Sequence, residues 1–201
     1  LNNSGFGFSN PNLTWSDLSK NNNGTISSGI WVSDDAETRK NARLRLNGVN
    51  EYVNMGYVNV GNTVTLDVVI SANSIQSGEK DIISNFESGG VGISLKSGVP
   101  TFTIYIAGTG YVSVSAKKAL TVGEKTRITA TYDGSMMKIY INNVLDDQKS
   151  QSGIIKAPES NTVMIIGANP SGSNAVEIID RVFKAKSGKK ISEAKSHTIH
   201  Y

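Results

Sequence analysis

Apolar and polar residues alternate along most of the chain from Arg43 onward, with a period of two residues. The run at residues 64–70 is strongly apolar, and comparable runs recur as far as residue 185. Gly, Asn and Asp separate the runs, and these residues favour tight turns. Because successive side chains of a strand point to opposite faces, the pattern predicts about a dozen short strands. We therefore expect an all-β protein built as a two-sheet antiparallel β-sandwich, or jelly roll.

The segment ITATYDGSMMKIYI contains a clear hairpin signal. Its Asp133-Gly134 pair suits a two-residue type I′ loop, which would place Ala130 opposite Met137. Directly paired residues share a face of the sheet, so one face of this hairpin is expected to be apolar. The apolar face would carry Ile128, Ala130, Tyr132, Met137, Ile139 and Ile141.

A second turn is predicted at Asn142-Asn143, because Asn tolerates the positive φ angles that a type I′ loop requires. Continuing that register would place Asp146 opposite Ile139 on the buried face, where an unpaired carboxylate is unfavourable. We therefore expect the strand after Asn143 either to be very short or to bulge near Asp146.

The segment at residues 101–116 predicts another hairpin. Its apolar residues fall on one face only if Tyr105 lies opposite Tyr111, with Gly108 and Gly110 in the turn. The two tyrosines would then lie side by side on a solvent-facing surface that is rich in Thr and Ser.

The rest of the chain is less regular. Residues 1–42 are polar and rich in turn-forming residues, and only residues 190–197 read as a short helix. We find no linker, composition break or repeat, so we expect one domain over residues 1–201, with residues 1–11 as a loosely ordered leader. The chain begins with Leu1 and shows no signal peptide, which suggests a domain excised or processed from a larger protein.

Composition narrows the class of protein. Charged residues make up 18% of the chain, and the net charge is +3 at pH 7. The lysines between residues 184 and 195 are interpreted as a solvated surface in preference to a site for an anionic partner. The absence of cysteine excludes disulfides and thiolate metal sites. No arginine-rich stripe indicates nucleic-acid binding, and no apolar run is long enough to span a membrane.

Four segments carry a family resemblance through their order along the chain. They are DLSKNNNGTISSGIWV (17–32), ARLRLNGVNEYVNMG (42–56), TRITATYDGSMMKIYINNVL (126–145) and VEIIDRVFKAKSGKKISEAKSH (176–197). Together they resemble the laminin-G-like jelly-roll domains of the concanavalin A-like lectin/glucanase superfamily, in the bacterial and phage style. The chain departs from the family pattern at residues 124–126, where a tryptophan is usual, and at Asn142-Asn143, where Asp-Gly is usual. The resemblance implies a fold and does not by itself imply one function.

Some glucanases of that superfamily carry their catalytic carboxylates on one strand, as Glu-x-Asp-x-x-Glu. The nearest string that we identify is EIID, in which Glu177 and Asp180 are three residues apart and face opposite sides of a strand. The only histidines, His197 and His200, lie near the chain end. We therefore expect no catalytic residues, and a glycoside hydrolase or lyase is the least favoured function.

A structural Ca²⁺ is a second expectation, since Ca²⁺ prefers carboxylate, amide and carbonyl oxygens. The loop DLSKNNNGT supplies Asp17, Asn22 and Asn23. The resemblance implies that such a loop can hold the ion near the closing strand, where Asp180 would contribute. The alternative is that Asn and Gly serve turn geometry alone.

Carbohydrate binding is what the resemblance implies most often. The candidate ligand-binding residues are Tyr105, Tyr111, Thr101, Thr103 and Ser113. The alternative is that the paired tyrosines only cover a sheet face. We expect Trp15 and Trp31 to be core anchors.

The sequence thus favours a non-catalytic carbohydrate-binding or adhesion module of a larger surface, secreted or phage tail protein. Its expected location is extracellular, at a cell surface or on a virion, and its expected partners are glycans and other domains of the parent protein. The alternative function is a structural or protein-interaction spacer in a virion or cell-wall assembly.

Overall fold

The computed structural model describes residues 6–8, 14–15, 23–33, 43–159, 162–170 and 177–187. These residues form strands β1 to β16. Within these ranges there is no helix that could span a membrane. The predicted leader at residues 1–11 lies largely outside the described residues, and the predicted helix at residues 190–197 lies wholly outside them.

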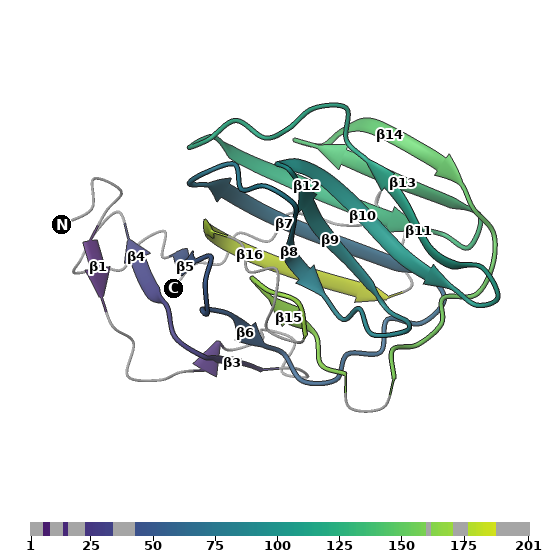
Figure 1. The fold of residues 1–201 in the computed structure, drawn as a ribbon, viewed down its shortest axis with the longest axis horizontal. Coiled ribbons are helices and arrows are strands. Elements are labelled where there is room, and N and C mark those ends of the chain that lie inside the picture. Colours follow the sequence, from purple (N-terminus) through teal and green to yellow (C-terminus); the bar gives the residue numbers. More distant parts are fainter. Residues whose placement is uncertain are drawn as a thin grey trace.

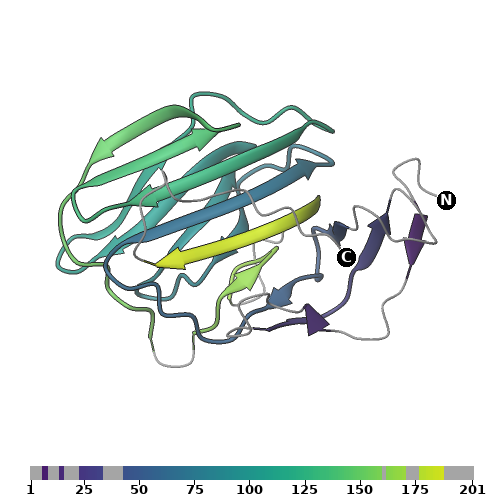
Figure 2. The same cartoon turned by 180° about the vertical axis from the view of Figure 1, so that it is seen from behind.

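The strands form two sheets that lie one in front of the other in Figures 1 and 2. Sheet A has the order β1 (Phe6–Phe8), β4 (Ile30–Ser33), β5 (Arg43–Asn47), β16 (Glu177–Ser187), β7 (Val64–Ala72), β12 (Lys125–Tyr132), β13 (Met136–Ile141) and β14 (Val144–Ser150). Sheet B has the order β11 (Gly110–Ser115), β10 (Val99–Ile106), β9 (Val91–Lys96), β8 (Glu79–Ser84), β15 (Ile165–Ile166), β6 (Val53–Asn54), β3 (Gly24–Ile26) and β2 (Thr14–Trp15). The neighbouring strands pair antiparallel, which confirms the predicted sandwich.

The core lies between the sheets and follows from the period-two pattern. In β7, for example, every second residue from Val64 to Ala72 is buried. Leu66 and Ile70 from this strand are completely buried, as are Ile93 and Phe102 from sheet B. Each such side chain contributes about 1.5–3 kcal/mol by leaving water.

The hairpin formed by β12 and β13 confirms the predicted faces and corrects the predicted register. Ile139 lies opposite Ala130, where Met137 was expected, so the pairing is displaced by two residues. The cause is Asp133, whose Oδ1 accepts hydrogen bonds from the backbone N–H groups of Ser135 and Met136, both within 2.9 Å. These bonds lengthen the loop, and a shift of two residues leaves every side chain on its predicted face.

The turn between β13 and β14 confirms the second loop. Asn142 and Asn143 have φ angles of 50° and 70°, and the pairing resumes at Ile141 and Val144. The register then shifts next to Ile139, which faces Asp147, so Asp146 is the bulged residue. The predicted bulge is therefore confirmed, although the strand continues to Ser150 and is not short.

The hairpin formed by β10 and β11 has the predicted register, with Tyr105 directly opposite Tyr111. Gly108 and Gly110 have φ angles of 77° and 99°, which the turn requires and which residues with a side chain rarely adopt. This hairpin forms one edge of sheet B and carries the candidate site.

Candidate functional site

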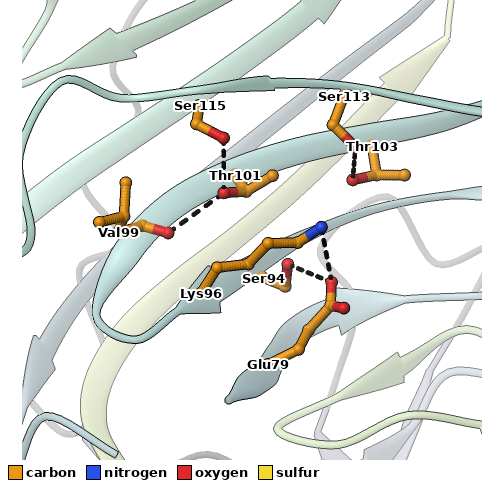
Figure 3. A network of polar contacts seen from close by, with 8 residues as sticks. All are labelled: Glu79, Ser94, Lys96, Val99, Thr101, Thr103, Ser113 and Ser115. Carbon is orange, nitrogen blue, oxygen red and sulfur yellow. Dashed lines mark hydrogen bonds and ion pairs between the residues drawn. The ribbon is translucent and has the colours of Figure 1, made fainter. Parts of the chain in front are cut away.

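The outer face of sheet B is polar over strands β8 to β11. Thr101 pairs with Ser115 of β11 on one side and with Ser94 of β9 on the other, and Thr103 pairs with Ser113. Figure 3 shows that these side chains lie on one face of the sheet.

Hydrogen bonds between hydroxyl groups join neighbouring strands on this face. The Oγ atoms of Thr103 and Ser113 are 2.8 Å apart, and those of Thr101 and Ser115 are 2.9 Å apart (Figure 3). Because Thr101 donates its proton to the carbonyl of Val99, Ser115 is the donor in the second pair. We call Thr101, Thr103, Ser113 and Ser115 the hydroxyl ladder.

The two threonines of the hydroxyl ladder are not solvent-facing, contrary to the prediction. Thr101 is 1% exposed and Thr103 is 6% exposed, whereas Ser113 is half-buried. Each threonine lies on β10 with a neighbouring strand on both sides, so its short side chain is enclosed. The structure therefore leaves the serines of β11 as the accessible hydroxyl groups of the ladder.

An ion pair between Glu79 of β8 and Lys96 of β9 lies on the same polar face. Oε1 of Glu79 accepts a hydrogen bond from Oγ of Ser94 at 2.8 Å and lies 3.7 Å from Nζ of Lys96 (Figure 3). The charged side chains are partly exposed, so the pair contributes less than about 1 kcal/mol to stability.

Three aromatic rings gather where β10 and β11 meet their connecting turn. The ring centroids of Tyr105 and Tyr111 are 4.8 Å apart, and those of Phe86 and Tyr111 are 5.6 Å apart, both edge to face. Nζ of Lys156 lies 5.2 Å from the centre of the Tyr105 ring, within cation–π range. We call Phe86, Tyr105 and Tyr111 the aromatic platform.

The platform depends on a glycine beneath it. A Cβ atom at Gly92 would lie 2.7 Å from Cζ of Phe86 and 2.6 Å from the carbonyl oxygen of Ile83. Only the absence of a side chain at this position lets the Phe86 ring lie against the sheet.

Two loop segments hold the platform from outside the sheet. Gly90 donates its N–H to the carbonyl of Lys156, and Lys156 donates its N–H to the carbonyl of Tyr105, both at 2.9 Å. The hydroxyl of Tyr111 donates to the carbonyl of Gly89 at 3.3 Å. Burial raises the pKa of this hydroxyl, and the carboxylate of Glu87 raises it further, so Tyr111 is a neutral donor at pH 7.

Tyr111 is the exposed member of the platform. Tyr111 is 50% exposed, whereas Tyr105 is less exposed and falls in the intermediate range. Large apolar rings that stay exposed beside fixed hydrogen-bonding groups are typical of binding surfaces. The arrangement offers a ligand one flat apolar face, the Ser113 hydroxyl and the Lys156 ammonium group.

A sequence profile described as the concanavalin A-like lectin/glucanases superfamily, of laminin-G type, matches residues 47–182. The chain belongs to this superfamily. The match covers the strands of the aromatic platform and the hydroxyl ladder. No curated protein sequence matches the chain significantly.

Solved structures share the superfamily fold at low sequence identity. The receptor-binding domain of the botulinum neurotoxin C/D mosaic serotype has a TM-score of 0.66 and 15% identity, and the match covers 86% of this chain and 45% of that one. The binding domain of Paraclostridial Mosquitocidal Protein 1 has a TM-score of 0.65 and 21% identity over 88% of this chain and 47% of that one. Domain 4 of AbnA, a GH43 extracellular arabinanase from Geobacillus stearothermophilus solved with arabinotriose, has a TM-score of 0.66 and 13% identity over 86% of both chains. This chain thus spans about half the length of the toxin domains that it matches.

The superfamily includes glucanases, and the structure reveals a closer match to their Glu-x-Asp-x-x-Glu pattern than EIID. The string EKDIIS places Glu79 and Asp81 on the outer face of β8. A bulge at Ile82 returns Ser84 to the same face, where the pattern has its second glutamate. The string is present in the sequence, whereas the bulge that places Ser84 on this face is seen only in the structure. A serine cannot replace the second carboxylate that a retaining hydrolase needs at about 5 Å from the first.

The superfamily resemblance also suggested a calcium site, which stays a prediction. Asp17 and Asn22 lie outside the described residues, and Asn23 is exposed immediately before β3. The backbone of Asp180 lies in β16 opposite Leu44 of β5. Within the described ranges, no three His, Asp or Glu residues come together as a possible metal site.

Proposed function

We propose that this domain is a non-catalytic carbohydrate-binding module, and that the sugar lies on the aromatic platform. The observation that carries the proposal is the half-exposed ring of Tyr111, which Phe86 and Tyr105 hold edge to face. Sugar rings present apolar C–H faces that pack on aromatic rings, and their hydroxyl groups need fixed hydrogen-bonding partners beside the ring. Ser113, two residues after Tyr111 on the same face of β11, and Lys156, over the Tyr105 ring, supply such partners.

The residues predicted from the sequence take different roles in this proposal. Tyr111, Tyr105 and Ser113 contact the ligand. Thr101 and Thr103 are buried and do not contact the ligand; Thr103 shares a hydrogen bond with Ser113, and Thr101 shares one with Ser115. Phe86 and Lys156 join the site from loops that lie far from β10 and β11 in the sequence.

The structural neighbours support a binding role for the fold. Two of them are described as toxin binding domains, and the arabinanase domain was solved with arabinotriose. We extend this role to the present chain as part of the proposal, and we place the domain in a larger secreted or cell-surface protein. A structural Ca²⁺ near Asp17 and Asp180 is included in the proposal as a stabilising ion that does not contact the sugar.

A glycan array tests the proposal. The 201-residue domain is applied with and without a chelator, and we expect selective binding to a small group of glycans that survives removal of Ca²⁺. Silence across bacterial and host glycans would contradict the proposal and favour a structural spacer. Hydrolysis of any bound glycan would contradict the non-catalytic assignment.

A further inference from the structure

Four segments of the described chain lie at the end of the sandwich away from the aromatic platform. They comprise residues 73–78, 97–98, 117–125 and 142–146, of which residue 125 begins β12 and residues 144–146 begin β14, and we call them together the loop tip. Backbone hydrogen bonds of 2.9 Å join Gly123 to Ala72 and Leu120 to Gly98. Lys117 donates its backbone N–H to Oδ2 of Asp146 at 2.6 Å. The segment 117–125 therefore connects the other three, and the segment that follows β7 lies beside the one that precedes β12 (Figure 1).

The loop tip carries several exposed aliphatic side chains. Four of the eight large hydrophobic residues that are exposed in the described structure belong to it: Ile75, Val122, Val144 and Leu145, which are 43% to 69% exposed. Ile75 lies over the turn of β9 and β10, since a Cβ atom at Gly98 would be 2.9 Å from its side chain. The burial pattern of the sandwich does not require apolar residues at these positions, because they lie outside the core.

The loop tip also carries exposed lysines. Lys117, Lys118 and Lys125 are exposed within the loop tip, whose carboxylates are those of Glu124 and Asp146. Asp146 is already engaged by the backbone N–H of Lys117, which offsets part of its charge. The segment 117–125 therefore combines an exposed valine with a net charge of +2, and the carboxylates of Asp146 and Asp147 lie at the border of the loop tip in β14.

We propose that the loop tip docks on the surface of an anionic lipid bilayer. The aliphatic side chains enter the headgroup region, and the lysines interact with anionic headgroups at its surface. A lipid surface fits better than a protein partner for two reasons. Lysine is depleted in the centre of protein interfaces, where aromatic residues and arginine are enriched, and the exposed large apolar residues of the loop tip are all aliphatic. Lysine side chains can also lie along apolar surface while their ammonium groups reach the headgroups.

This proposal does not depend on the carbohydrate-binding proposal. The loop tip begins next to Val99 at one end of β10, and Tyr105 of the platform lies near the other end. At about 3.3 Å per residue, the two positions are separated by about 20 Å along the strand. A domain docked through its loop tip would thus keep the platform away from the bilayer.

Co-sedimentation with vesicles tests the proposal. The wild-type domain is expected to bind phosphatidylcholine vesicles that contain phosphatidylserine, to bind pure phosphatidylcholine vesicles much more weakly, and to be released by salt. Val122→Ser should weaken binding about tenfold by removing one inserted side chain. Lys117→Gln and Lys118→Gln should each weaken it about fivefold.

Matched variants elsewhere in the chain separate docking from general effects. Ile154→Ser removes an exposed aliphatic side chain at the platform end, where Ala107 donates its N–H to the Ile154 carbonyl, and Lys149→Gln removes an exposed lysine of β14. Both variants should bind like the wild type. Tyr111→Ala should also leave vesicle binding unchanged, whatever its effect on glycans. Equal losses in the loop-tip and control variants would overturn the proposal. Failure of the wild type to bind phosphatidylserine vesicles would also overturn it and leave a protein as the occupant of the loop tip.

Discussion

The carboxylate of Asp146 accepts a hydrogen bond from the backbone N–H of Lys117 at 2.6 Å. Asp146 is the bulged residue of β14 at the edge of sheet A, and Lys117 lies in the loop that leaves β11 at the edge of sheet B. Without the bulge, the Asp146 carboxylate would face the apolar core opposite Ile139. With the bulge, it forms a hydrogen bond that links the edges of the two sheets, which we call the sheet tie.

Removing this tie should destabilise the sandwich. Asp146→Ala is expected to lower the free energy of unfolding by about 1 kcal/mol, because it deletes a charged acceptor while water can reach the freed N–H of Lys117. Urea unfolding measures the change. The control is Asp147→Ala, since Asp147 bonds only the N–H of the adjacent Gln148 and should lose less than about 0.5 kcal/mol. Equal losses of unfolding free energy in the two variants would show that the hydrogen bond between Asp146 and Lys117 does not stabilise the sandwich.

A second polar contact stabilises the outer face of sheet A. The Oδ1 atom of Asp67 accepts hydrogen bonds from Nε of Arg127 and from Oγ1 of Thr129, both at 2.9 Å. The hydrogen bond with Asp67 raises the pKa of Arg127. Because both charged side chains are partly buried and Asp67 also accepts from Thr129, we expect Asp67→Ala to cost about 1–3 kcal/mol in urea unfolding. Lys96→Ala breaks the more exposed pair with Glu79 and should cost less than about 1 kcal/mol. A larger loss for Lys96→Ala would contradict this ranking.

The hairpin loop should make stability depend on acid pH. Burial raises the pKa of Asp133, but hydrogen bonds from the Ser135 hydroxyl and from the backbone of Ser135 and Met136 outweigh it, and the pKa lies below its ordinary value of 3.8. The lowered pKa stabilises the folded state fully above pH 3.8, and this contribution is lost as the pH falls through the pKa of the folded state. Wild type should therefore be more stable than Asp133→Asn at pH 7, and the difference should shrink as the pH drops below 3.8. Thermal unfolding across this range measures it, and a constant difference would exclude the proposed cause.

Alternation alone was enough to predict the faces of the strands. It placed Ile128, Ala130 and Met137 correctly, and in β10 and β11 it also predicted the register, because only one pairing keeps both apolar sets together. The register next to Asp133 could not be predicted in this way. It depends on which backbone N–H groups one carboxylate accepts, and loops of two and four residues produce the same faces.

The candidate site was predictable only in part for a similar reason. The pairing of Tyr105 with Tyr111 follows from the strand pattern, whereas the burial of Thr101 depends on its neighbours on both sides in the sheet. Phe86 and Lys156 reach the platform from loops, where no period links a residue to its position in space. The Glu79–Ser84 string is present in the sequence. Its Ser84 can be placed on the same face as Glu79 only when the bulge at Ile82 is known.

The most direct test of the carbohydrate-binding account compares two tyrosines. Tyr111 is 50% exposed on the platform and Tyr57 is 49% exposed elsewhere, so the two alanine variants remove equally accessible rings. Affinity for a glycan identified on the array is measured by calorimetric titration. Tyr111→Ala is expected to weaken binding at least about tenfold, or ~1.4 kcal/mol, while Tyr57→Ala binds like the wild type. Unchanged affinity in a folded Tyr111→Ala domain would contradict the account.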